Sequence, residues 1–424
     1  MSDEMGDEMG DKMGDKMGDK MSDKMRDKKH GKIFFTMPAR LNPTLLKQTL
    51  ACALGALALL TAPIVQAADR AVGSLRFIGE QRIASGLMYR DTAVGGLSGL
   101  DYDAASDTWY LVSDDRSEKA PARFYTARLH LDADAFHGIT LTGVSLFTQQ
   151  DGKPYPSRLR QVFARGEIAD FESIRIDPTD RTLWYTSEGD CITTHRDPSI
   201  THGSAAGAFI SRIEPPAMLR LCHPIGSGSR FNATFEGLTF SADGRTLWVS
   251  MEGPTHEDGP LPTVESGAFG RVTEFSRDGA VLRQVAYPID AVVPVPAQGK
   301  HGENGVSDML AVDEHRFLMI ERGAAQDENG RWSNDIRLYE MDIRDATDVK
   351  DMPALREGAF KPATKRLVLN LEALSLQRLD NIEGIAWGPK LPNGHDTLVL
   401  VSDDNFHPPQ VTQLLAFEVL PPVN

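Results

Sequence analysis

The chain alternates short apolar runs with polar turns, and residues 233–254 (ATFEGLTFSADGRTLWVSMEGP) are the most regular example. Glu236 stands at the start of one apolar run, the turn SADGRT follows, and a second apolar run ends at Glu252. Two such runs around an Asp-Gly turn predict a β-hairpin. Because the start of the first strand lies beside the end of the second, Glu236 and Glu252 are expected at one edge of the sheet.

The same pattern recurs in residues 95–115, 170–190, 305–323 and 380–404. Matching the polar residue at the start of each first strand gives intervals of 74, 64, 72 and 75 residues, between Ser98, Glu172, Glu236, Asp308 and Glu383. Self-similarity at a nearly constant period is typical of a repeat architecture. Further strand pairs separate the hairpins, for example ARFYTARLHLD and ITLTGVSLFT. Each repeat is therefore predicted to form four antiparallel strands.

We predict an all-β fold, a single β-propeller of five or six four-stranded antiparallel blades, within residues 68–424. The segments Leu75–Ile83 and Val411–Val419 have no partners inside their own repeats, so their pairing would close the ring. A sixth, degenerate blade would have to lie in residues 255–300 or 325–370. A pair of β-sandwiches is the alternative, but it leaves the recurrence of acids at matched positions unexplained.

In a propeller the first strand of every blade lines the central channel, so the matched acids are expected around one mouth of it. Many carboxylates in one place repel each other or take up protons unless a cation is bound. Oxygen ligands without clustered histidines or thiolates favour calcium over zinc. The predicted metal ligands are Asp114, Glu172, Glu236, Asp308, Glu321, Glu383 and Asp403. For any one of them, a turn cap or a solvated charge is the simpler interpretation, and only the repetition favours a site.

Glu188 and Glu252 end their hairpins and are our candidates for a general base. Arg116 and Arg322 follow acidic hairpin ends, and with His256 and His301 they are candidates for binding an anionic substrate group. Surface charges and loop histidines without a role are the alternative. The sequence has no G-x-S-x-G, P-loop or H-E-x-x-H motif, so the common serine-hydrolase, nucleotide and zinc-protease classes have no support.

The N-terminal part differs from the repeats. Residues 1–36 consist largely of MGDK-type repeats with no apolar periodicity, and we interpret them as a disordered extension or an unused upstream start. Residues 37–67 contain Arg40 and Lys47, the apolar run LACALGALALL and the small-residue site Val65-Gln66-Ala67, a pattern typical of a signal peptide. We therefore expect a periplasmic or secreted protein without a membrane span in its mature form.

The formal charge of the whole chain is −15, to which residues 1–36 contribute −1 and residues 37–67 contribute +2, so the remainder carries −16. An acidic exported protein is not expected to bind nucleic acid. Two of the three cysteines, Cys191 and Cys222, follow the cleavage site, and in an oxidising compartment we expect them to form a disulfide. Two thiols too far apart to pair are the alternative.

Five motifs, in order, resemble the phytase-like family, described as having esterase-like activity of phytase. They are GGLSGLDYD, FESIRID with SEGD, FEGLTFSADGRTLWVSMEGP, GVSDMLAVDE with ERG, and NIEGIAWGP with VSDDN, and the resemblance covers roughly residues 92–406. The resemblance implies an exported β-propeller and suggests hydrolysis of phosphoesters or esters. The family is similar in architecture to calcium-dependent propeller phytases. The sequence departs from the repeated acid at Ser98.

Together these observations predict a monomeric, calcium-dependent hydrolase of a small-molecule phosphate or carboxylic ester, acting at the acidic mouth. A lactonase-type propeller is an alternative within the enzymes. A propeller that binds a ligand or partner without catalysis, with structural calcium, is the alternative from another class, and the fold does not decide among the three.

Overall fold

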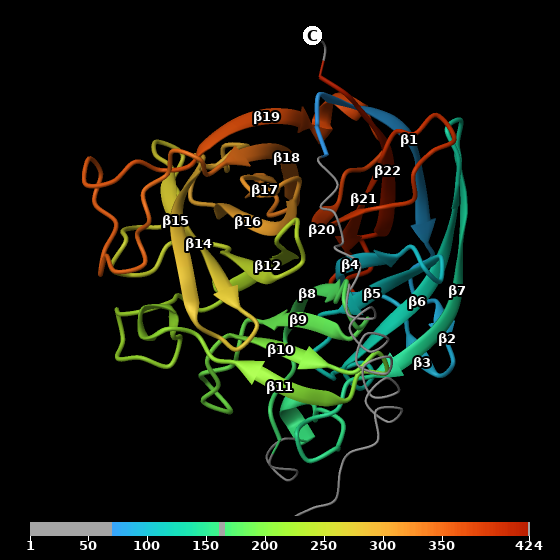
Figure 1. The fold of residues 1–424 in the computed structure, drawn as a ribbon, viewed down its shortest axis with the longest axis horizontal. Coiled ribbons are helices and arrows are strands. Elements are labelled where there is room, and N and C mark those ends of the chain that lie inside the picture. The colour runs from blue at the N-terminus through green and yellow to red at the C-terminus, as the bar shows by residue number, and fades with distance from the viewer. Residues whose placement is uncertain (1–69, 161–165, 423–424) are drawn as a thin grey trace, which may run out of the picture. The chain divides into compact units, whose positions relative to one another are not determined.

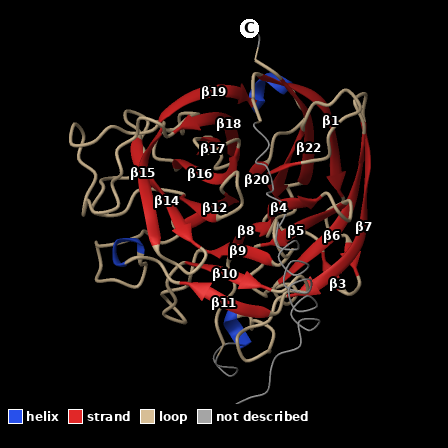
Figure 2. Ribbon diagram, in the orientation of Figure 1, coloured by secondary structure: helices blue, strands red, loops and turns tan. Residues whose placement is uncertain are grey.

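The computed structural model describes residues 70–160 and 166–422. The predicted extension (1–36) and signal peptide (37–67) lie outside these residues. Five antiparallel sheets of four strands stand side by side around a common axis (Figure 1). Outside the strands there are loops, a small hairpin and two short 3₁₀ helices (Figure 2). The predicted propeller is confirmed, with five blades.

The bounds of the elements follow the repeats. Blade 1 contains β4 (Leu97–Asp103), β5 (Thr108–Ser113), β6 (Arg123–Leu131) and β7 (Phe136–Leu146). Blade 2 contains β8 (Phe171–Ile176), β9 (Leu183–Ser187), β10 (Ser199–Gly203) and β11 (Phe209–Ile213). Blade 3 contains β12 (Phe235–Phe240), β13 (Thr246–Met251), β14 (Ala268–Ser276) and β15 (Val281–Ile289). Blade 4 contains β16 (Gly302–Ala311), β17 (Arg316–Gln326), β18 (Trp332–Asp342) and β19 (Thr364–Asn370).

Blade 5 joins the two ends of the described chain. It contains β20 (Asn381–Trp387), β21 (Thr397–Asp403), β22 (Thr412–Leu420) and the N-terminal strand β1 (Ser74–Ile83). Strand β1 pairs with β22 from Ser74↔Leu420 to Ile83↔Thr412, which confirms the predicted closure of the ring. The remaining elements are β2 (Met88–Tyr89), β3 (Thr92–Ala93), η1 (Ala217–Leu219) and η2 (Leu371–Leu374).

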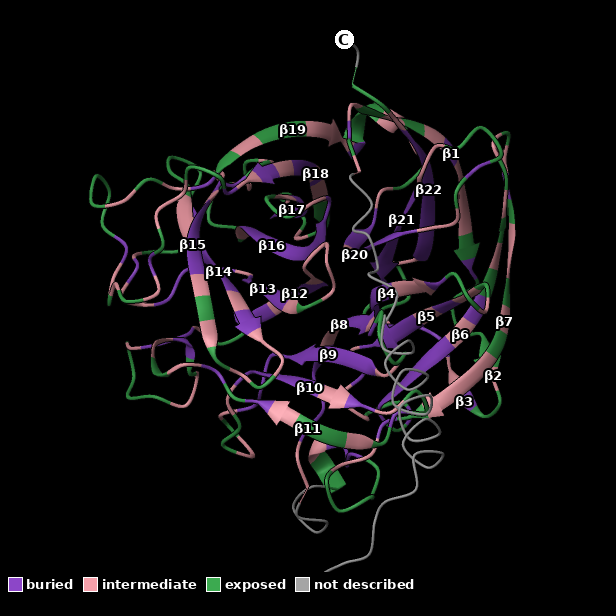
Figure 3. Ribbon diagram, viewed as in Figure 1, coloured by how far each residue is buried: buried purple, intermediate pink, exposed green. Residues whose placement is uncertain are grey.

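The core is divided into layers between consecutive blades. Side chains of blades 1 and 2 pack together around Phe124 and Tyr185, and a similar apolar layer fills each of the other four interfaces. Trp109, Trp184 and Trp248, from the second strands, are 1–3% exposed in three of these layers. The inner strands are almost wholly buried and the outer strands alternate with exposed positions (Figure 3). Burial on both faces explains why the inner strands have continuous apolar runs.

Within residues 70–160 and 166–422, no helix has the length and apolar character needed to cross a bilayer.

Candidate functional site

A β-bulge near the start of every inner strand determines which side chain faces the mouth. In blade 2, Phe171 pairs with Ser187 and Ile174 with Tyr185, so the strand between them carries an extra residue. The other four inner strands have the same irregularity. Bulges of this kind redirect a side chain without ending the sheet. The bulged positions are Ser98, Glu172, Glu236, Ser307 and Glu383.

The residue after the bulge explains the recurring Glu-Gly and Ser-Gly pairs. A Cβ atom on Gly237 would lie 2.6 Å from the Met309 amide nitrogen of the next blade, and one on Gly99 would lie 2.6 Å from the Glu172 carbonyl oxygen. Glycine therefore allows neighbouring inner strands to approach closely below the mouth.

The mouth is an open cavity of about 1490 Å³. Twelve carboxylates and five lysine or arginine side chains line it, so its surface is strongly acidic. Seven of these carboxylates were predicted to share the mouth, namely Asp114, Glu172, Glu188, Glu236, Glu252, Glu383 and Asp403. Three come from the bulges, and the other four stand at the ends of the second strands.

Two groups of three carboxylates are close enough to share an ion. Oxygens of Asp170, Glu172 and Glu188 lie within 4.8 Å of one another, and so do oxygens of Glu188, Glu236 and Glu252. Glu188 belongs to both groups. The donor set consists of carboxylate oxygens alone, so it fits a hard cation such as Ca²⁺ and not zinc.

Two guanidinium groups lie among these acids. Arg116 contacts Asp170 at 2.5 Å and Glu188 at 3.8 Å. Arg322 contacts Glu252 at 3.0 Å and also lies 3.2 Å from Glu303 and 3.8 Å from Glu383. Two positive charges do not balance the carboxylates around them.

The excess of negative charge and the burial of the side chains raise the pKa values of these carboxylates. Burial, and then the charge of Glu252, raises the pKa of Glu188 to about 7. Burial also raises the pKa of Glu252 to about 7 against the opposing effect of Arg322, and that of Glu383 to about 8. For Glu172 and Glu236, burial followed by neighbouring carboxylates raises the pKa well above its ordinary value. Burial and mutual repulsion therefore disfavour the charged forms of these carboxylates when no cation is bound.

A family model described as "Phytase-like: Esterase-like activity of phytase" matches residues 92–406. The chain belongs to the phytase-like family. The match covers the strands from β4 to β21 and includes all seven predicted acids of the cavity. No curated protein matches the sequence.

Solved structures similar to this phytase-like chain have low sequence identity to it. One is a thermostable family-43 glycoside hydrolase (11% identity, TM-score 0.39), covering 77% of this chain and 90% of that one. Another is an α-L-arabinofuranosidase from Lactobacillus brevis (11%, TM-score 0.38; 76% and 91% covered). The Dos1 propeller is a third (7%, TM-score 0.31; 82% and 96% covered). These similarities concern the fold alone.

Blade 4 of this phytase-like propeller corrects two predicted ligand positions. The bulged residue is Ser307, so Asp308 takes the place of the glycine that follows the bulge in blades 1, 3 and 5. Its carboxylate lies inside the channel, 2.9 Å from Arg175 Nη2, and accepts the Ile385 amide hydrogen at 3.0 Å. Arg175 also donates to Leu100 O at 2.6 Å, so this ion pair joins blades across the channel. Asp308 is thus part of the packing below the mouth.

Glu321 also lies one residue away from the position at which the other blades carry an acid facing the mouth. It pairs with Val306, while Arg322 takes the place that acids have in the other four blades. The Glu321 carboxylate points away from the mouth, where it accepts hydrogen bonds from Tyr287 Oη at 2.7 Å and Asn304 Nδ2 at 3.0 Å. It is 1% exposed and does not line the cavity among the described residues.

The predicted substrate-binding residues fall into two sets. Arg116 and Arg322 line the cavity, as expected. His256 and His301 are not among the described residues that line it. His301 packs edge-to-face on Trp332, with ring centroids 5.6 Å apart, and lies 3.2 Å from Glu303. His256 lies in the loop after Glu252, where its amide donates to Gly228 O.

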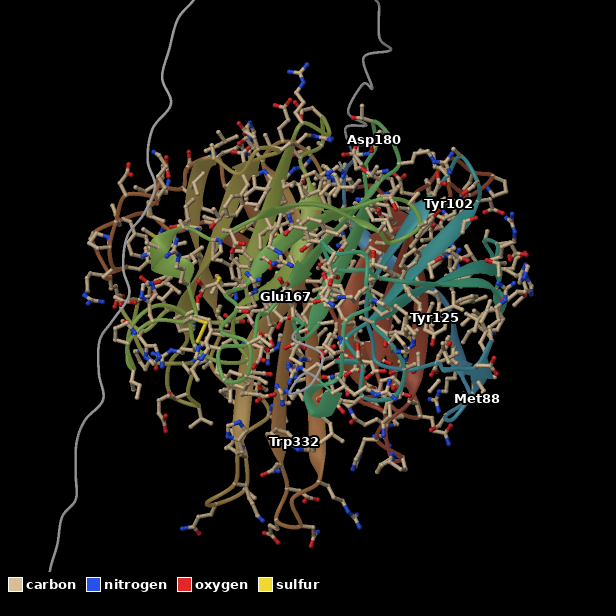
Figure 4. All side chains as sticks on the ribbon, turned by 90° about the horizontal axis from the view of Figure 1, so that it is seen from below. Met88, Tyr102, Tyr125, Glu167, Asp180 and Trp332 are labelled. Atoms are coloured by element: carbon tan, nitrogen blue, oxygen red, sulfur yellow. A yellow bond between two sulfur atoms is a disulfide. The ribbon has the colours of Figure 1, made fainter. Side chains whose placement is uncertain are left out.

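The predicted disulfide between Cys191 and Cys222 is present, with Cα atoms 5.2 Å apart (Figure 4). It joins the loop that follows Glu188 to the loop that leads to β12. Asp197 Oδ1 joins the same loops by accepting the Cys222 amide hydrogen at 2.7 Å. Both connections hold the segments that carry Glu188 and Glu236.

Sequence reasoning missed Asp170, which belongs to the first carboxylate group. Its signal was available, because Asp170 directly precedes β8, at the end of the strand where the other acids were expected.

Proposed function

We propose that this phytase-like protein is an exported, metal-dependent hydrolase that cleaves a small-molecule phosphate or carboxylic ester in the acidic cavity. The observation that carries the proposal is the convergence of the repeated carboxylates into two groups of three that share Glu188. Family membership supports a hydrolase, and the disulfide together with the pattern of residues 37–67 supports export.

The residues that would hold calcium are Asp170, Glu172 and Glu188 in one group and Glu188 and Glu236 in the other. A bound cation would polarise the ester and increase the acidity of water. The large carboxylate excess accounts for the need for such a cation, because two arginines leave most of the charge uncompensated.

The protein's own residues would divide the remaining roles. Glu252 would accept the proton of the attacking water as general base, and Arg322 Nη2 holds its carboxylate at 3.0 Å. Arg116 is the more exposed of the two arginines, with a side chain 27% exposed against 13% for Arg322. It is therefore available to bind an anionic group of the substrate.

A substrate panel tests the proposal. Purified protein lacking residues 1–67 would be assayed against aryl phosphates, phytate, aryl acetates and lactones, with calcium and with chelator. We expect calcium-dependent hydrolysis of a phosphate or carboxylic ester and a loss of about 100-fold or more in kcat for Glu252→Gln. Glu303→Gln, an acid of the same cavity outside both carboxylate groups, is the control. Hydrolysis that survives chelation and Glu252→Gln would contradict the proposal, and so would inactivity toward the whole panel.

A further inference from the structure

Blade 4 extends beyond the mouth, unlike the other blades. Its pairing continues past the bulge from Val306↔Glu321 to Gly302↔Ala325, and β17 pairs with β18 as far as Gln326↔Trp332. In the other blades the inner pair ends within two residues of the bulge. Four additional pairs at about 3.3 Å each give a projection of roughly 13 Å. We call residues 302–306 and 321–334 the arm, and Figure 4 shows it projecting with Trp332 on it.

The arm forms one wall of the cavity and presents Trp332 on it. Trp332 is 49% exposed and lines the cavity. The other four tryptophans of the chain are 1–9% exposed in the core. His301 packs against the Trp332 ring at 80°, which restricts the orientation of the indole. An indole held half-exposed on a cavity wall is a surface on which another flat group can stack.

The cavity has apolar groups at its rim in addition to its acidic base. Ala324 on the arm, and Leu376, Phe406 and Pro409 from blade 5 loops, line it together with Trp332. Its volume of about 1490 Å³ exceeds that of the usual site for a drug-sized ligand, about 300–1000 Å³. The base alone therefore does not account for the extent of the cavity.

We propose that Trp332 is a specificity residue on which an aromatic ring of the substrate stacks while the ester group, joined to that ring by a flexible chain, lies at the acidic base. The inference rests on the proposed function, because it names the substrate class of the same cavity. A polyanion without an apolar face gains nothing from the indole, and the twelve carboxylates of the lining repel it. A monoester with an aromatic ring at the end of a flexible chain places one anionic group among the arginines and its ring at the rim.

Binding of two non-hydrolysable probes in calcium, 6-phenylhexylphosphonate as the aryl probe and methylphosphonate as the methyl probe, tests the proposal by calorimetry. Trp332→Ala should weaken the aryl probe about three- to tenfold and leave the methyl probe unchanged, since aromatic pairs contribute about 0.5–1.5 kcal/mol. Trp332→Phe should keep most of the aryl affinity. Leu367→Ala is a matched control, because Leu367 is also 49% exposed but is not among the described residues lining the cavity.

Tryptophan fluorescence gives a second measurement that needs no turnover. The aryl probe should quench the long-wavelength emission of the one exposed tryptophan among the five, and this component should be missing in Trp332→Phe. Equal affinity of wild type and Trp332→Ala for the aryl probe, equal losses for both probes, or no binding by wild type would each overturn the proposal. Stacking without hydrolysis of any ester would refute the proposed function alone, whereas ester hydrolysis with unchanged aryl binding in Trp332→Ala would refute the stacking alone.

Discussion

Replacing Glu188 by glutamine should stabilise the metal-free protein and remove most of the stabilisation that calcium provides. Glu188 contributes to both carboxylate groups, whose oxygens lie within 4.8 Å of each other. Two like charges at that distance repel by roughly 3 kcal/mol at an effective dielectric constant of about 20. Metal-free Glu188→Gln should therefore melt at a higher temperature than metal-free wild type.

With calcium this difference should shrink. At a calcium concentration about 100 times the Kd, binding stabilises the folded state by about 2.7 kcal/mol, which corresponds to roughly 5 °C in Tm for a chain of this length. Loss of a shared ligand that weakens binding about 100-fold would reduce the stabilisation to about 0.4 kcal/mol, or less than about 1 °C.

Melting curves by scanning calorimetry, each with calcium and with chelator, measure both effects. Glu303→Gln removes a carboxylate from the same cavity but from neither group, so it should keep the full calcium-induced rise in Tm. A full rise in Glu188→Gln would refute the assignment of Glu188 as a shared ligand.

Further predictions concern acidity, the channel and the disulfide. The folded pKa of Glu383 is raised to about 8, so the folded state binds more protons than the unfolded state between the ordinary pKa of a glutamate and about 8. The metal-free protein should therefore gain stability as the pH falls through that window. A Tm that falls as the pH is lowered there would contradict this. Arg175→Met leaves Asp308 buried without its partner and should cost about 3–5 kcal/mol of unfolding free energy in denaturant titration, partly restored by adding Asp308→Asn. Replacing Cys191 and Cys222 by serine should cost about 3–4 kcal/mol, and an unchanged Tm would show that the bond contributes little to stability.

The fold could be predicted because each blade repeats the same apolar pattern. The strands flanking the acids, the closure by β1 and β22 and the buried tryptophans all follow from period-two alternation and from recurrence along the chain. Whether a sixth blade was present could not be predicted, because the long loops of residues 254–267 and 343–363 have the length of strand pairs. The structure gives them no strands.

The errors in the site arose from one bulge. Aligning blade 4 with the other blades by its acids selected Asp308 and Glu321 as ligands. Asp308 follows the bulged Ser307 by one residue, and Glu321 precedes Arg322, which occupies the matched position, by one residue. Matching by the apolar residue before the bulge, Val306, would have aligned Ser307 with Ser98. The arm was missed for a different reason, since extra pairs beyond the mouth follow the same alternating pattern as the strands within the blade.

The most direct test of the calcium site is anomalous diffraction from crystals of the protein containing a calcium-like lanthanide. We predict a peak at the base of the cavity about 2.3–2.6 Å from carboxylate oxygens of Glu188 and of Asp170, Glu172 or Glu236. A strong peak elsewhere, or no peak at these carboxylates at saturating lanthanide, would contradict the proposed metal site.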